Sequence, residues 1–308
     1  MCGIGGAQLR EGDGDAKLLA QNLLHELTVR GSHASGIAWH ENNADKTWVM
    51  KHNSPGREFA KSLKNEQIGN TFIVHTRFAT QGHQSNMNNN HPIDVEGIVG
   101  VHNGHINNDD ELIAKCKGYK RKGKVDSEAA FAYLAHGPKA RGLYARLSDI
   151  SGGAALMWLN SCGPRKILHI VRLSNSPLCF GQTEKGSVIV ASTKDILLKA
   201  CNKSNISLKH IEELKEGLYL RFEKGEITQM QDIELPKPAL KKKLWWTYPA
   251  EQQYVSSFGQ YEDGRFKTRM DSLLQELEQE QLDFEADLLA DEREMQRTLW
   301  DIHYKEGE

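Results

Sequence analysis

Short apolar segments set the fold class of this chain. They are four to eight residues long, rich in Ile and Val, and bounded by Gly, Asn, Asp or Lys, a pattern typical of β-strands. The expected strands are 4–9, 36–40, 48–51, 72–75, 98–102, 154–159, 167–171, 187–191, 218–222 and 227–230. Helical spacing is clear only at 16–27 and 127–135, with a shorter candidate at 196–201. Because strands outnumber helices, we expect a layered α+β domain instead of a regular βαβ repeat.

Composition narrows the possible functions. The formal net charge of −2 over 308 residues gives no overall field that would favour nucleic acid or an acidic membrane. No apolar run approaches the ~20 residues of a membrane span, and the first residues lack the basic and apolar regions of a signal peptide. The five cysteines are odd in number and not spaced as metal-binding pairs. We therefore expect a cytoplasmic protein with no metal and no cofactor.

The chain divides into three parts by its composition and hydrophobic pattern. Residues 1–235 carry the expected strands and helices, and the Pro-containing stretch that follows begins a linker over 236–266. Residues 267–308 predict an acidic amphipathic helix, with 13 acidic and three basic side chains within 271–308. Its narrow apolar stripe over 267–304 suits a partner helix or a second copy of the chain, although packing on its own domain is the alternative.

Cys2 is the most informative single residue. Removal of Met1 would leave a thiol and a free α-amino group on one residue. An α-amino group has a pKa of about 7.7–8.0, so near neutral pH much of it is a base that can activate the thiol. The alternative is an ordinary buried cysteine at the start of a strand.

Four further residues follow expected strands or begin a helix. Arg77 ends one strand and offers a planar fork suited to a carboxylate. Asn103 and Gly104 end another, where a side-chain amide and a backbone N–H can stabilise an oxyanion. Asp126 precedes the helix at 127–135 and can hold an ammonium group. Each also has a plainer explanation. Arg77 can form a structural ion pair, Asn103-Gly104 can be a turn, and Asp126 can be a helix N-cap.

The order of these segments resembles the glutaminase domain of class II glutamine amidotransferases, the N-terminal-nucleophile (Ntn) type. Glucosamine-phosphate synthase and amidophosphoribosyltransferase belong to that family. The resemblance spans about residues 1–232. The matching stretches are MCGIGG, VRGSHASGIAW (29–39), HTRFAT (75–80), NNHPI (89–93), VHNGHINN (101–108), KVDSEAAFAYL (124–134), LSNSPLCFG (173–181) and VIVASTKDIL (188–197).

The resemblance implies a four-layer αββα sandwich followed by the C-terminal helical extension. It implies that Cys2 attacks the side-chain amide of L-glutamine, with Asn103 and the Gly104 amide as the oxyanion hole. It also implies a substrate-binding set, in which Arg77 takes the α-carboxylate and Asp126 the α-ammonium. The further members of that set are Phe78, Thr80, His91 and Arg30.

Some positions depart from the family pattern. His33 stands where relatives commonly carry Asp, and Phe78 and Gln81 stand where one subgroup has Trp and His. Two other signals are weak: Ser151-Gly152-Gly153 lacks the residues of a pyrophosphate loop, and the basic, aromatic stretch 241–246 leaves nucleic acid open although it is not expected.

Relatives join the glutaminase to a synthase domain that consumes the ammonia. About 70 residues follow position 236, too few for such a domain, so a separate ammonia-accepting synthase is expected. Two alternatives are an Ntn-type amidase acting on another amide and a non-catalytic scaffold that retains the fold. The acceptor and the final product are not indicated by the sequence.

Overall fold

The computed structural model describes residues 1–42, 45–160 and 165–235. The expected linker over 236–266, the acidic helix over 267–308 and the basic stretch 241–246 lie outside the described residues. Every helix in the described part is too short or too polar to cross a membrane.

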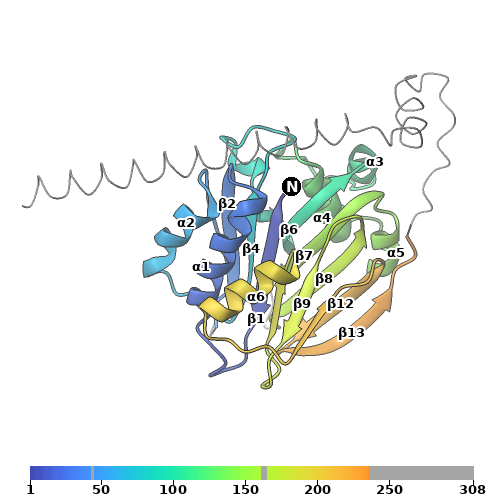
Figure 1. Cartoon of the computed structure of the whole chain (residues 1–308). Helices are drawn as coiled ribbons and strands as arrows, with labels where there is room; N and C mark the ends of the chain where they lie inside the picture. The colour runs from blue at the N-terminus through green and yellow to red at the C-terminus, as the bar shows by residue number, and fades with distance from the viewer. Residues whose placement is uncertain (43–44, 161–164, 236–308) are drawn as a thin grey trace, which may run out of the picture. The chain divides into compact units, whose positions relative to one another are not determined.

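Two antiparallel sheets form the centre of the domain (Figure 1). The seven-stranded sheet has the order β11-β9-β10-β1-β4-β2-β3, and the six-stranded sheet has the order β13-β12-β8-β7-β6-β5. The strands of the first sheet are β1 (Gly3–Gln8), β2 (Ala34–His40), β3 (Thr47–His52), β4 (Thr71–Arg77), β9 (Cys179–Gln182), β10 (Val188–Ala191) and β11 (His210–Glu213). Those of the second are β5 (Ile93–Val95), β6 (Ile98–Ile106), β7 (Gly152–Asn160), β8 (Ile167–Ser174), β12 (Leu218–Glu223) and β13 (Glu226–Asp232).

Helices cover the outer face of each sheet, as Figure 1 shows. The helices are α1 (Ala16–Leu27), α2 (Gly56–Ser62), α3 (Asp109–Ala114), α4 (Asp126–His136), α5 (Leu143–Ser148) and α6 (Lys194–Lys203). One core joins α1, α2 and α6 to the seven-stranded sheet, a second joins α3, α4 and α5 to the six-stranded sheet, and a third lies between the sheets. The expected αββα arrangement is therefore confirmed.

Local chemistry explains where the longer helices begin. The Asp15 carboxylate accepts hydrogen bonds from the backbone N–H groups of Lys17 and Leu18 at the start of α1. Thr193 caps α6 in the same way. The expected N-cap role of Asp126 is wrong by one residue, because α4 begins at Asp126 itself and Val125 flanks it. The carboxylate of Asp126 is consequently free of the capping position and turns toward β6.

All ten expected strands and all three expected helices are present, with ends shifted by a few residues. The strands β5, β9 and β11 and the helices α2, α3 and α5 were not expected from the sequence. Each has seven residues or fewer, so neither the strand pattern nor the helix pattern repeats often enough to be recognised.

The layer between the sheets ends where β1 begins. The side chain of Ile4 from β1 meets those of Val99 and Val101 from β6 in this layer. Residues two apart on a strand share a face, so Asn103 continues the row of Val99 and Val101, and Cys2 has the parity of Ile4. The apolar layer is thus followed at this end by a thiol and an amide.

Candidate active site

Cys2 lies just before β1, at the edge shared with the end of β4. Gly3 pairs with Thr76, and the Cys2 Sγ contacts the carbonyl oxygen of Phe78 at 3.6 Å. Arg30 donates from Nε to the Cys2 carbonyl oxygen at 3.0 Å. The first residues of the chain are therefore held from both sides, by the residues after β4 and by the 3₁₀ turn Thr28–Arg30.

Burial dominates the electrostatics of this thiol. It raises the pKa of Cys2, because the thiolate loses water, and the Asp126 carboxylate acts in the same direction. A hydrogen bond with the Phe78 backbone, the amino-terminal charge and the Arg77 guanidinium lower the pKa. Both Arg77 and Asp126 therefore lie close enough to the sulfur for their charges to be felt.

Asn103 holds a buried amide with an unused donor. Its side chain is 1% exposed, and Nδ2 has no hydrogen-bond partner among the described residues. A buried amide N–H without a partner is unfavourable by roughly 1–3 kcal/mol unless another group uses it. The position is therefore suited to an acceptor that comes from outside the chain.

Gly104 follows with a backbone conformation that favours glycine. Its φ is +137°, and a Cβ built there would lie 1.9 Å from the carbonyl oxygen of Gly153. No side chain fits between β6 and β7 at this point, so glycine is required both by conformation and by space.

A hydrogen bond between the two sheets brings these residues to one end of the domain. The His75 ring, two residues before Arg77 on β4, donates from Nε2 to the carbonyl oxygen of His102 on β6 at 3.2 Å. Cys2 lies beside the end of β4 and Asn103 follows His102 directly. The thiol and the amide consequently belong to the same edge of the interlayer.

Arg77 organises the loop that follows it. The guanidinium is part of a residue only 3% exposed, and it donates from Nη1 to Asn90 Oδ1 at 2.9 Å. Nη2 donates to the carbonyl oxygen of Gly82 at 2.7 Å and to that of Gln81. The loop 78–90 is thus folded around the cation that was expected to meet a carboxylate.

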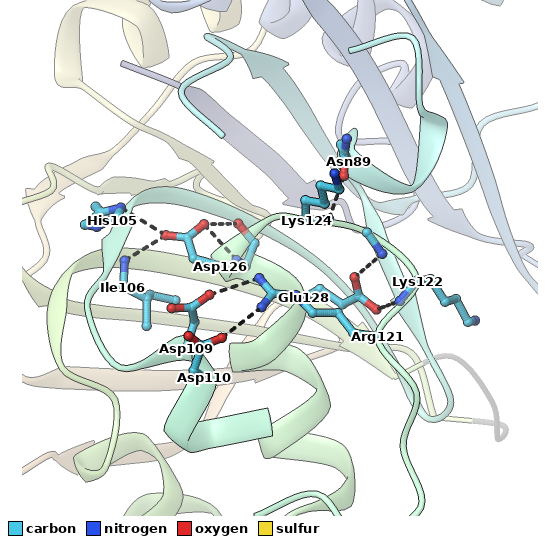
Figure 2. A network of polar contacts seen from close by, with 12 residues as sticks. Asn89, His105, Ile106, Asp109, Asp110, Arg121, Lys122, Lys124, Asp126 and Glu128 are labelled. Carbon is cyan, nitrogen blue, oxygen red and sulfur yellow. Dashed lines mark hydrogen bonds and ion pairs between the residues drawn. The ribbon is translucent and has the colours of Figure 1, made fainter. Parts of the chain in front are cut away.

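Asp126 accepts hydrogen bonds from two backbone groups. Oδ2 accepts from the Ile106 N–H at 2.7 Å and Oδ1 from the Ser127 N–H at 2.8 Å. His105 Nδ1 lies 3.5 Å from Oδ2 (Figure 2). The carboxylate is therefore fixed between the end of β6 and the start of α4, beside the residues that follow Gly104.

Glu128 and Asn89 are structural parts of the site that the sequence analysis missed. Glu128 is 2% exposed and accepts from the backbone N–H groups of Lys122 and Gly123, each at 2.6 Å. Asn89 Oδ1 accepts from the Lys124 N–H at 2.8 Å (Figure 2). The Asn89 contact joins the loop after Arg77 to the loop before Asp126, and the Glu128 contacts hold that second loop on α4. For Asn89 the available signal was the cluster of four asparagines at 86 and 88–90, since Asn side chains bond to nearby backbone in turns.

The remaining expected site residues occupy different depths. Phe78 is 46% exposed, and Thr80 is exposed in the same loop. His91 is 4% exposed and stacks on His75 with ring centroids 4.1 Å apart. Arg30 donates a hydrogen bond to the Cys2 carbonyl oxygen, as described. Phe78 and Thr80 thus stand at the surface of the site, whereas His91 lies behind it.

The neutral imidazoles of His75, His91 and His102 form what we call the inner wall of the site. Burial lowers the pKa of His75 to about 3, and it also lowers the pKa values of His91 and His102. Among the described residues, no group of three or more His, Cys, Asp or Glu side chains is arranged to hold a metal ion. At neutral pH these rings add no charge beside Arg77.

A cavity of about 1040 Å³ lies elsewhere, at the opposite end of β1. Gln8, Thr71 and Lys166 are among its lining residues, and it includes none of the expected site residues. The convergence of Cys2, Arg77, Asn103 and Asp126, and not this hollow, marks the candidate active site.

Comparison with known proteins agrees with this geometry. Residues 75–199 match the family of the glutamine amidotransferase domain. This part of the chain is therefore similar to a glutamine amidotransferase domain. That match includes Arg77, the Asn103-Gly104 pair and Asp126.

The curated relatives are longer proteins. Glutamine–fructose-6-phosphate aminotransferase from Clostridium acetobutylicum is 30% identical over 204 residues, which are 64% of this chain and 32% of the relative. The enzyme of the same name from Wigglesworthia glossinidia brevipalpis is 36% identical over 140 residues, or 44% of this chain and 22% of the relative. The chain thus spans about a third or less of the length of these proteins.

A solved structure shows the fold. Glutamine phosphoribosylpyrophosphate amidotransferase from B. subtilis, complexed with ADP and GMP, matches with a TM-score of 0.61 and 18% identity. The match covers 75% of this chain and 49% of that structure. The described domain therefore has the fold of that structure, the Ntn-hydrolase fold.

We predict that Gly104→Ala destabilises the domain by more than about 2 kcal/mol, because the added methyl group combines backbone strain with a clash against Gly153. Urea unfolding measures this change. Gly97→Ala separates strain from clash, since its φ is +94° and nothing lies within 4 Å of the built Cβ. An effect of Gly104→Ala no larger than that of Gly97→Ala would contradict the close packing of β6 on β7.

Proposed function

We propose that this domain hydrolyses L-glutamine to glutamate and ammonia, with Cys2 as an N-terminal nucleophile after removal of Met1. The observation that carries the proposal is the placement of the Cys2 thiol at the end of the interlayer where β4 ends in Arg77 and β6 ends beside Asp126, a cation and an anion that shift the pKa of the thiol in opposite directions. A free α-amino acid carries one negative and one positive group at its head, so this pair of charges suits it.

In the first half-reaction the α-amine of Cys2 takes the thiol proton and the sulfur attacks the side-chain amide carbon. The carbonyl oxygen becomes an oxyanion. When it collapses, the C–N bond breaks, the leaving nitrogen takes the proton from the ammonium of Cys2, and ammonia departs. A γ-glutamyl thioester remains on Cys2.

In the second half-reaction water attacks the thioester carbon and gives its proton to the same α-amine. The C–S bond breaks, and glutamate leaves with the thiol restored. Because the base and the nucleophile belong to one residue, neither step needs a catalytic histidine. Burial lowers the pKa values of His75, His91 and His102, which makes these rings weaker bases.

Asn103 and Gly104 are proposed to stabilise the oxyanion. The support is the buried Nδ2 of Asn103, which has no partner among the described residues, on the row that leads to the end of the interlayer. A preorganised donor of this kind needs no rearrangement when negative charge develops.

Arg77 and Asp126 are proposed to bind the α-carboxylate and the α-ammonium, with Phe78 and Thr80 at the entrance. Arg30 is proposed to position Cys2 through its carbonyl oxygen, and His91 to support the site from behind. The polar head of the substrate is thereby held while the amide faces the sulfur, and such positioning can contribute several kcal/mol.

We predict that Cys2→Ala lowers glutamine hydrolysis by at least about 10³-fold, since the attacking atom is lost. Glutamate release is the measurement, and Cys116→Ala, which removes a buried thiol beside α3, is the control with unchanged activity. Full activity in Cys2→Ala would exclude the mechanism. Intact mass showing Met1 on an active enzyme would exclude the α-amine as base.

Asn103→Ala is expected to lower kcat by about 10²–10³-fold with a smaller change in KM, because the donor acts mainly on the transition state. Steady-state kinetics with glutamine tests this. Asn202→Ala, on the exposed side of α6, serves as the matched control. An unchanged kcat in Asn103→Ala would remove this amide from the oxyanion hole.

We also propose that the ammonia passes to a separate acceptor protein with a synthase activity. The support is the acidic pattern of 267–304 with its narrow apolar stripe, which suits a partner helix. The longer relatives are named glutamine–fructose-6-phosphate aminotransferases, and the acceptor in that name is the acceptor of those proteins.

Affinity purification of the full chain from its source is expected to retain such a partner, and Leu274→Ser with Leu277→Ser to lose it. Glutamine hydrolysis by the purified variant is expected to be unchanged. Glu278→Gln, off the apolar stripe, is the control. Loss of soluble protein in the double leucine variant would instead indicate that the stripe packs on its own domain.

A further inference from the structure

The segment 30–33 holds the residues on both sides of the Cys2 sulfur. Arg30 fixes the Cys2 carbonyl oxygen, as described, and the His33 N–H donates to the Arg77 carbonyl oxygen at 3.0 Å. Between them Gly31 packs against backbone: a Cβ there would lie 2.5 Å from the Arg77 carbonyl carbon and 2.6 Å from the Phe78 nitrogen. This short segment therefore determines how the residues after β4 approach the start of β1.

The ring of His33 adds two contacts to the same residues. Nδ1 accepts a hydrogen bond from the Ala79 N–H at 2.9 Å. The ring also stacks on Phe78, with centroids 5.0 Å apart and an interplanar angle of 29°. Because Nδ1 accepts here, the ring is neutral and its proton is on Nε2.

The peptide that His33 holds is the one that faces the thiol. The Phe78 carbonyl oxygen contacts Cys2 Sγ at 3.6 Å, and this carbonyl belongs to the same peptide unit as the Ala79 N–H. A peptide unit is planar with N–H and C=O pointing in opposite directions. An acceptor on the N–H side therefore fixes the direction of the oxygen on the other side.

We propose that His33 is a positioning residue for the nucleophile. It orients the Phe78–Ala79 peptide through Nδ1, so that the carbonyl oxygen faces the Cys2 thiol and Phe78 stays over the entrance. This inference rests on the proposed function for its effect on turnover, but the effect on the thiol itself does not require that function.

A pair of substitutions separates the hydrogen bond from the bulk of the ring. The Asn Oδ1 atom lies close to the position of the imidazole Nδ1, whereas the Gln Oε1 atom reaches the position of Nε2. His33→Asn therefore restores an acceptor for the Ala79 N–H, and His33→Gln does not. His33→Phe keeps an aromatic ring against Phe78 but supplies no acceptor.

The first readout is alkylation of Cys2 by iodoacetamide, followed by peptide mass spectrometry. We expect His33→Gln and His33→Phe to alkylate Cys2 several-fold faster than the parent chain, because the peptide that covers the sulfur is released. His33→Asn is expected to stay within about twofold of the parent. His210→Asn is the control, since His210 also has an aromatic contact, with Phe180, but lies on β11.

The second readout is glutamine turnover. We expect kcat to fall about tenfold in His33→Gln and His33→Phe, with KM changing less, and to recover in His33→Asn. Equal behaviour of the Asn and Gln variants in both readouts would overturn the proposal. If the Gln and Phe variants do not fold, recovery of folding and of the parent alkylation rate in His33→Asn supports it, and failure of His33→Asn to fold overturns it.

The two proposals fail in different ways. Full turnover in Cys2→Ala would end the proposed function while leaving the alkylation comparison intact. Conversely, parent-like alkylation in His33→Gln would end the positioning role even if Cys2 is essential for turnover.

Discussion

The face-to-face packing of two antiparallel sheets is the constraint on which the site depends. Strand residues two apart share a face, so the apolar rows of β1 and β6 that fill the interlayer also direct Cys2 and Asn103. A change of register by one residue in either strand would turn its functional side chain toward the helices. The hydrophobic layer therefore provides most of the precision with which the polar groups are placed.

Charge at this end of the domain is confined to a few groups. Arg77 and Asp126 influence the Cys2 thiol from different elements, whereas the three histidines of the inner wall are kept neutral by burial. Neutral rings add no charge of their own to the fields of Arg77 and Asp126 at the sulfur. Arg77 and Asp126 thus act on the thiol through their charge, whereas the three histidines contribute packing.

Much of the architecture could be predicted from the sequence, but the hydrogen bonds that hold the loops of the site could not. The helix at 16–27 was expected with its observed ends because its apolar spacing is regular. Cys2, Arg77, Asn103, Gly104 and Asp126 follow or precede recognisable elements, and their order within the family motifs indicated that they act together. Glu128 and Asn89 are different, since their partners are backbone N–H groups of loops, and the sequence does not say which N–H groups these side chains meet. The orientation of His33 toward Ala79 depends on tertiary packing in the same way.

The contacts of Arg77 have a consequence for ligand entry. Its guanidinium is already withdrawn from water and satisfied by the carbonyl oxygens of Gln81 and Gly82 and by Asn90. In the proposed function, the carboxylate of the substrate would therefore meet a cation that is already dehydrated, and it would replace or join neutral acceptors that the loop supplies. Its affinity would then depend partly on how firmly residues 81–90 hold the positive charge.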